Sequence, residues 1–238
     1  SLMGKGLSDL NTSAVDYQIT YSKRKTIGLY VRKDGSVEVR CAKNTPKSAI
    51  DRFVSNNQNW LNKKVALMKA KDAERAGFRL EIGSQLLFMG AEYPLAAKEG
   101  GKAGFDSEQF YVPPGLSGED LKINIIKLYK ELARKIISLK VCHYAQIMGV
   151  APASVKINSA KTRWGSCSGK DSLNFSWLLI MADDSVINYV VVHELAHIKQ
   201  HNHSLKFWRE VEKLIPDYKQ ATARLKLLYQ KISGENWS

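Results

Sequence analysis

The sequence of 238 residues is poor in cysteine and contains no long apolar run. Its three cysteines, Cys41, Cys142 and Cys167, are an odd number, lie far apart and form no C-x-x-C pair. This pattern excludes a cysteine zinc ribbon and argues against a disulfide framework, so we expect reduced thiols. A membrane-spanning helix needs about 20 consecutive apolar residues. The sequence has no such stretch, and we expect no membrane partner.

The beginning of the chain also lacks an apolar segment of signal-peptide length. Ser1 and Leu2 precede Met3 and resemble a cloning remnant, so we expect the native chain to begin at Met3. Reduced cysteines and the lack of a signal peptide together predict a cytoplasmic protein.

Acidic residues are scarce relative to basic ones. The chain has 36 Lys+Arg against 23 Asp+Glu, which gives a net charge of +13. Such a charge attracts nucleic acids, nucleotides and other polyanions. The basic residues are scattered, however, and no recognised nucleic-acid-binding motif accompanies them. Two interpretations stay open: non-specific nucleic-acid binding through the basic surface, and a solvated basic surface without specific function.

Residues 1–114 are predicted to form a β-rich domain with one helix. Strands are expected at 17–21, 26–31 and 36–40, with Asp34-Gly35 as a hairpin turn. A helix is expected from Pro46, with Thr45 as its N-cap, running into the lysine-rich segment 63–71. Short strands follow over 78–112. Pro113-Pro114-Gly115 then indicates a domain joint.

Residues 115–238 are predicted to form a second domain, which makes the fold class α+β. An amphipathic helix over 118–148 is expected to end at Gly149. Strands 154–157 and 162–167 are followed by a turn at 169–171 and by an antiparallel return over 172–180. The remaining segments predict helices from Asp184-Ser185 into the histidines, over 204–215 and over 218–231.

The segment from His193 to His197 reads His-Glu-Leu-Ala-His. Residues four apart lie on one face of a helix, so both imidazoles can bind one metal ion. Glu194 stands beside the first ligand, where its carboxylate can reach a water molecule that zinc activates. Four of the five histidines of the chain fall between His193 and His203. The pattern therefore predicts a Zn(2+) site with Glu194 as general base.

A catalytic zinc ion needs a third protein ligand. His201 follows His193 by eight residues, or about 12 Å along a straight helix, which is too far for one ion. His203 avoids this problem if the helix stops after Gln200 and Asn202 adopts a left-handed turn. We therefore favour His203, with Glu210 and Glu212 as alternatives.

Several segments together resemble the YgjP-like metal-dependent hydrolase family, which is related to the SprT and WLM groups of zincin proteases. They lie throughout the chain: Ser22–Thr26, Arg163–Cys167, Val190–His197, Asn202–Ser204, Phe207-Trp208 and Pro216–Tyr218. The resemblance implies a zincin-like domain in the C-terminal third, with an active-site helix beside an antiparallel sheet. It also implies zinc at His193, His197 and His203 and a catalytic Glu194. Ser176 stands where many relatives carry asparagine, so no role of that asparagine is transferred.

The resemblance places 162–167 beside the active-site helix, where substrate binds. Arg163 can clamp a carboxylate or a phosphate. Trp164 can stack on a base or pack beneath the helix. Gly165 permits close approach of the backbone. Cys167 is more typical of a buried thiol than of a ligand.

The motif defines the mechanism more closely than the substrate, because metal-activated water attacks carbonyl and phosphoryl centres alike. Peptide hydrolysis is the leading interpretation, since the family resembles zincin proteases. A nucleotide substrate is the alternative: a nucleoside triphosphate pyrophosphatase, for example one acting on UTP, would fit the positive charge. A third interpretation is a nucleic-acid-associated, SprT-like module.

Overall fold

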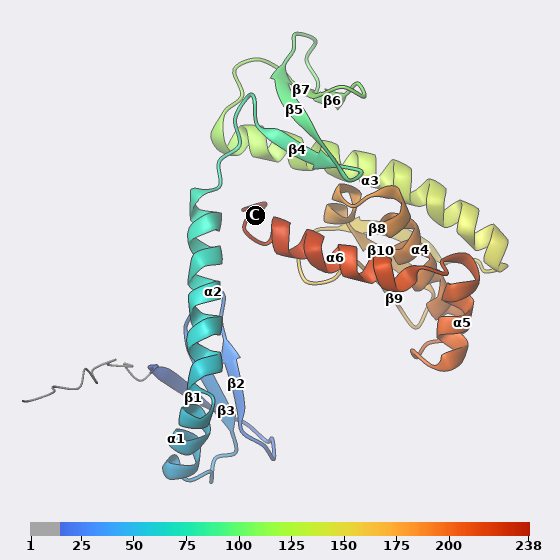
Figure 1. Ribbon diagram of the computed structural model, residues 1–238. Helices are drawn as coiled ribbons and strands as arrows, with labels where there is room; N and C mark the ends of the chain where they lie inside the picture. Colours follow the sequence, from blue (N-terminus) through green and yellow to red (C-terminus); the bar gives the residue numbers. More distant parts are fainter. Residues whose placement is uncertain (1–14) are drawn as a thin grey trace, which may run out of the picture. The chain divides into compact units, whose positions relative to one another are not determined.

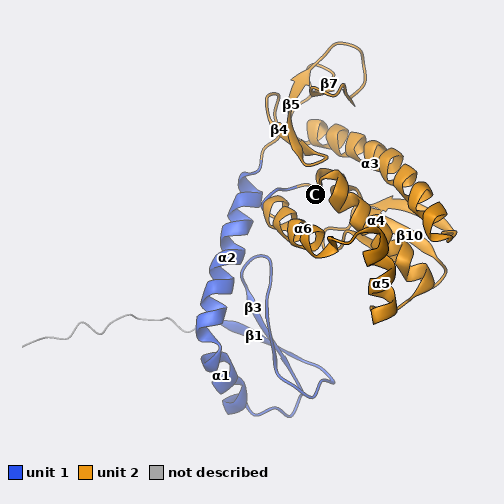
Figure 2. Ribbon diagram, turned by 45° about the vertical axis from the view of Figure 1, so that its right-hand side comes forward, with its two compact units in different colours: residues 1–78, 234–236 blue, residues 79–233, 237–238 orange. Residues whose placement is uncertain are grey.

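The computed structural model describes residues 15–238, and these form two compact units (Figures 1 and 2). Among the described residues, unit 1 comprises 15–78 together with 234–236, and unit 2 comprises 79–233 with 237–238. The expected division after residue 114 falls inside unit 2. The physical reason lies in aromatic packing: the ring centroid of Phe110 is 5.5 Å from that of Tyr129, so the segment before the joint packs on the helix after it.

Unit 1 is a three-stranded sheet with two helices on one face. Its elements are β1 (Tyr17–Tyr21), β2 (Gly28–Val31), β3 (Val37–Cys41), α1 (Lys47–Asn56) and α2 (Gln58–Gly77). The strand order is β1-β3-β2, with β1 parallel and β2 antiparallel to β3. The hairpin turn is confirmed: Gly35 has a φ of 84°, and Asp34 Oδ1 accepts a hydrogen bond from the Ser36 amide at 2.9 Å.

The apolar face of this sheet forms the core of unit 1 with the two helices. Val37, Val39 and Cys41 are buried against Ile50, Val54 and Leu61. Two details of the expected helix were wrong. Pro46, and not Thr45, is the N-cap residue, because Pro46 already has the extended φ and ψ of −61° and 140°. The helix also breaks at Asn57, whose φ of −108° separates α1 from α2.

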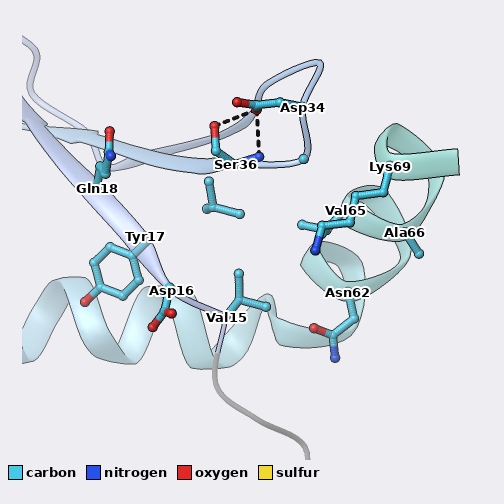
Figure 3. A pocket seen from close by; sticks show the side chains of 12 residues that line it. Val15, Asp16, Tyr17, Gln18, Asp34, Ser36, Asn62, Val65, Ala66 and Lys69 are labelled. Atoms are coloured by element: carbon cyan, nitrogen blue, oxygen red, sulfur yellow. Dashed lines mark hydrogen bonds between the residues drawn. The ribbon is translucent and has the colours of Figure 1, made fainter. Parts of the chain in front are cut away.

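An open cavity of about 740 Å³ lies between the start of β1, the β2–β3 turn and α2 (Figure 3). Val15, Val37 and Val65 contribute apolar surface to it, and Lys69 a charged side chain. The cavity belongs to unit 1, whereas the clustered histidines belong to unit 2.

The first half of unit 2 is a four-stranded sheet and a long helix. Its elements are β4 (Gln85–Phe88), β5 (Ala91–Ala97), β6 (Gly104–Phe105), β7 (Phe110–Val112) and α3 (Gly118–Met148). The strand order is β4-β5-β7-β6. A hydrogen bond links α3 to the sheet: the Tyr129 hydroxyl donates to the Leu87 carbonyl of β4 at 2.8 Å. The bounds of α3 are confirmed, and Gly149 ends the helix with a φ of 63°.

The second half of unit 2 carries the four clustered histidines. It contains β8 (Ser154–Asn158), β9 (Gly165–Cys167), β10 (Ser172–Ser176), α4 (Asp184–Lys199), α5 (Leu205–Leu214) and α6 (Tyr218–Ile232). The strand order is β8-β10-β9, with β9 antiparallel and β8 parallel to β10, so the sheet is mixed. The expected strand over 172–180 is wrong beyond Ser176. Trp177–Met181 is a short 3-10 helix whose side chains are all buried.

The predicted α+β class is confirmed, with three small mixed sheets and helices distributed along the chain. Among the helices of residues 15–238, none is both long and apolar enough to cross a membrane.

Candidate metal centre

Helix α4 carries the first two histidines into the interior of unit 2. Asp183 caps it, because its carboxylate accepts a hydrogen bond from the Val186 amide at 3.1 Å. The helix is apolar over most of its length, and Val190, Val191 and Val192 are all buried. Burial on nearly all sides holds the helix in one position and therefore fixes the direction of its polar side chains.

The chain reverses after α4 without the left-handed turn that was expected at Asn202. The helix ends at Lys199, and Gln200 leaves it in an extended conformation, with φ −139° and ψ 100°. Within residues 15–238, the non-glycine positions with positive φ are Met89, Ser107 and Asp171. The Asn202 side chain accepts a hydrogen bond from the Ser204 amide at 3.3 Å instead. The reversal nevertheless brings the segment after α4 back to the histidines.

Three histidines meet at this reversal. His193, His197 and His203 each offer a ring nitrogen, and these atoms all lie within 4.8 Å of one another. The Nε2 atoms of His193 and His203 are 3.2 Å apart. Two ligands of a tetrahedral zinc ion, each with a bond of about 2.1 Å, would be separated by roughly 3.4 Å. The donor set and its spacing therefore fit a zinc ion with an open fourth position.

Neighbouring groups orient the imidazoles. The Gln200 carbonyl lies 3.2 Å from His197 Nδ1, and because a carbonyl only accepts, Nδ1 carries the proton and leaves Nε2 free for a metal. The Tyr189 hydroxyl lies 3.4 Å from His193 Nδ1. Phe207 is fully buried beneath the cluster, with ring centroids 4.9, 4.5 and 4.8 Å from those of His193, His197 and His203.

Sequence reasoning missed Tyr189 and the Gln200 carbonyl. Tyr189 precedes His193 by one helical turn, and this spacing was the available signal. The sequence also did not indicate that Phe207 contacts all three histidines.

Glu194 lies about 100° around α4 from His193 and about 60° from His197. It packs against β9 and is only 6% exposed. A Cβ atom added at Gly165 would lie 2.8 Å from both Cγ and Oε1 of Glu194. The absence of a side chain at Gly165 thus makes room for the carboxylate. Burial raises the pKa of Glu194 to about 7, and the positive charge of Arg163 opposes this rise. A carboxylate that titrates near neutral pH is suited to accept and return a proton.

The residues considered on and before β9 differ in their exposure and contacts. Arg163 is exposed and close enough to act electrostatically on Glu194. Trp164 is half-buried, and its carbonyl accepts a hydrogen bond from the Ser176 amide at 2.9 Å. Cys167 is half-buried at the end of β9, and burial raises the pKa of its thiol.

The alternative third ligands are not in the cluster. His201 and Glu212 are exposed. The two carboxylate oxygens of Glu210 form ion pairs with Lys199 at 3.1 Å and Lys213 at 2.6 Å, so they are occupied elsewhere.

Two buried groups with opposite pKa shifts predict the pH dependence of the metal-free protein. Burial, together with His197 and His203, lowers the pKa of His193 from 6.5 to about 4. Burial raises that of Glu194 from 4.5 to about 7. Between about pH 4.5 and 6.5 the unfolded chain therefore binds a proton at His193, and the folded chain binds one at Glu194. Their contributions to the slope of stability against pH cancel.

Replacing either group should leave the pH dependence of stability that the other group causes. In metal-free Glu194→Gln, stability should rise with pH between 4.5 and 6.5, because only the unfolded state protonates His193. In metal-free His193→Gln, the contribution of Glu194 should instead make stability fall over that range. The lowered pKa of His197 affects both variants alike and cancels in their difference. The difference between the two free energies of unfolding, measured by urea denaturation, should change by on the order of 2 kcal/mol per pH unit. Parallel pH profiles would contradict burial of these two groups in their neutral forms.

An α+β fold in which a buried helix presents two histidines and a glutamate defines the class as a metallopeptidase-type domain. The comparison of the sequence with family models agrees: the model described as YgjP-like, metallopeptidase domain, matches residues 25–227. The chain therefore belongs to the YgjP-like family, and the resemblance noted from the sequence is confirmed.

Two solved structures show partial similarity. The metallopeptidase zymogen of Pyrococcus abyssi abylysin is 27% identical, with a TM-score of 0.36 over 42% of this chain and 97% of that chain. The metallopeptidase zymogen of Methanocaldococcus jannaschii jannalysin is 25% identical, with a TM-score of 0.35 over 40% of this chain and 96% of that chain. No curated protein shows significant sequence similarity to the chain.

Proposed function

We propose that this protein is a zinc-dependent peptidase in which His193, His197 and His203 hold the metal and Glu194 is the general base. The observation that carries the proposal is the meeting of three imidazole nitrogens within 4.8 Å, two of them from the helix that also holds a buried glutamate. A zinc ion bound there would supply Lewis acidity and activate a water molecule for attack on a carbonyl group.

The residues of the chain would then act in sequence. Glu194 takes a proton from the attacking water and returns it to the leaving amine nitrogen. Burial raises the pKa of this carboxyl, which favours the proton transfer to it from water. The Gln200 carbonyl and the Tyr189 hydroxyl lie at Nδ1 of His197 and His193, which would leave Nε2 of each ring free to bind the metal.

A peptide substrate is favoured by the position of β9. In the order β8-β10-β9 this strand lies at the edge of its sheet, and it packs beside α4. An extended peptide can add to such an edge through main-chain hydrogen bonds. Gly165 of β9 lies against Glu194, so a peptide on this edge would pass the general base. The exposed Arg163 lies just before the strand and could contact a carboxylate of the substrate.

The test is digestion of casein and of a peptide library by the zinc-loaded protein, with products identified by mass spectrometry. Cleavage is expected, together with its loss on chelation and its return on adding zinc. A parallel arm measures pyrophosphate release from nucleoside triphosphates, UTP among them. Chelator-sensitive release of pyrophosphate without any peptide cleavage would replace the peptidase with the nucleotide hydrolase.

A further inference from the structure

The sheet of unit 1 has one apolar face, which packs on α1 and α2, and a second face that carries mostly polar side chains. Side chains alternate along a strand, and the residues between the buried ones point away from α1 and α2. The strand registers place these residues side by side. We call them the outer sheet face: Gln18, Thr20, Gly28, Tyr30, Glu38 and Arg40. None of the described helices of unit 1 packs on this face, since α1 and α2 both contribute to the core on the other (Figure 2).

Three arginines contact the outer sheet face: Arg40, which belongs to it, and Arg24 and Arg32, which reach its Tyr30 and Glu38. Arg40 and Arg32 each direct one Nη2 atom to the same oxygen, Oε2 of Glu38, at 2.9 and 3.2 Å. Their side chains remain 45% and 53% exposed. The hydrogen bond from Arg40 contributes most to lowering the pKa of Glu38 to about 2, so this carboxylate stays ionised. The single negative charge of Glu38 thus faces two guanidinium groups. Each guanidinium has five N–H donors, and most of these donors do not contact Glu38.

The third arginine, Arg24, lies over β2 at one edge of the sheet. Arg24 Nη1 donates to the Tyr30 hydroxyl at 2.8 Å. A Cβ atom at Gly28 would lie 2.9 Å from this guanidinium, so the glycine in β2 makes room for it. Arg24 Nε is buried and has no hydrogen-bond partner among the described residues. The guanidinium is therefore held over the strands with donating capacity to spare, unlike a freely solvated surface charge.

Tyr30 is the aromatic residue of the outer sheet face, and it contacts both Arg24 and Arg40. Its ring is covered by the Arg40 guanidinium at 4.3 Å from the centroid, with that of Arg24 at 5.7 Å. The residue is still 39% exposed. A tyrosine on an open sheet with arginines around it offers a stacking surface for a base beside donors for phosphates.

The charge of the surrounding residues also favours a ligand that carries phosphates. Residues 15–78 contain 14 Lys or Arg against six Asp or Glu, a surplus of eight positive charges. Lys23 and Lys25 flank Arg24 and are both exposed. The outer sheet face carries no large aliphatic side chain that could enter a lipid layer, which disfavours a membrane surface.

We propose that the outer sheet face of unit 1 binds single-stranded nucleic acid, with Arg24, Arg32 and Arg40 contacting phosphates and Tyr30 stacking on a base. This site is separate from the candidate metal centre and does not depend on its function.

The test measures binding of a fluorescent oligothymidylate to the full-length protein by anisotropy across about 50 to 200 mM salt. The double variant Arg24→Gln/Arg32→Gln leaves Arg40 paired with Glu38. It should bind at least about tenfold more weakly and lower the slope of log K against log salt by about 1.4, or 0.7 for each lost phosphate contact. The matched control is Arg52→Gln/Lys63→Gln, which removes two exposed charges from α1 and α2. It should change affinity by less than about threefold.

A second pair of variants tests the base contact. Tyr30→Ala should weaken binding by about tenfold, whereas Tyr30→Phe, which keeps the ring, should stay near the wild-type value. Thermal melting verifies that each variant is folded. An equal loss in the Arg52/Lys63 control, no binding at the lowest salt, or equal displacement of the strand by polyglutamate at matched charge would each overturn the proposal.

Discussion

Glu194→Gln is expected to lower kcat/KM for peptide hydrolysis by about 10²- to 10⁴-fold, the range typical for loss of a general base. The amide keeps the size of the side chain but cannot accept a proton from water. Glu194 is buried and is not among the three residues proposed to hold the metal, so zinc content should be unchanged. Zinc measured by elemental analysis on the same sample separates loss of the base from loss of the ion.

Glu212→Gln is the matched control, since Glu212 is exposed and lies in the same unit. Its activity should equal that of the wild type. If Glu194→Gln kept more than about a tenth of the activity, general-base catalysis by this residue would be wrong.

Gly165→Ala should produce the second-largest effect. The new methyl group would lie 2.8 Å from Cγ and Oε1 of Glu194, so the buried carboxylate has to move. A displacement of about 1 Å in a catalytic group can lower the rate about 10²-fold. We expect a fall in kcat of that order with zinc content retained, because the nearest atoms to the new methyl group belong to Glu194 and not to a histidine.

Gly169→Ala provides the comparison. Gly169 lies in the turn between β9 and β10, and a Cβ atom there meets nothing within 4 Å. This variant should keep the wild-type kcat. Equal activity of Gly165→Ala and Gly169→Ala would contradict the close packing of β9 on Glu194.

Local signals predicted the parts of the fold that depend on local chemistry. Helix α3 was predicted with its observed bounds, because its apolar periodicity ends at a glycine that adopts a left-handed conformation. The hairpin turn at Asp34-Gly35 was equally recognisable. The meeting of His203 with His193 also followed from helix geometry, although the turn that produces it uses extended Gln200 in place of a left-handed Asn202.

Features decided by distant contacts were not predictable in this way. Trp177–Met181 is apolar throughout and buried throughout, so its sequence has no period that separates a strand from a 3-10 helix. The Pro113-Pro114-Gly115 segment has the composition of a joint, yet Phe110 before it packs on Tyr129 after it. The orienting role proposed for Tyr189 depends on a side-chain direction that sequence spacing only suggests.

The most direct test of the three-histidine site is the zinc content of His203→Ala compared with that of His201→Ala. Both substitutions remove an exposed histidine from the same reversal after α4, and only His203 belongs to the cluster. We expect about one zinc ion per chain in the wild type and in His201→Ala, and a large loss in His203→Ala after dialysis against a weak chelator. A full zinc complement in His203→Ala would contradict the proposed metal centre.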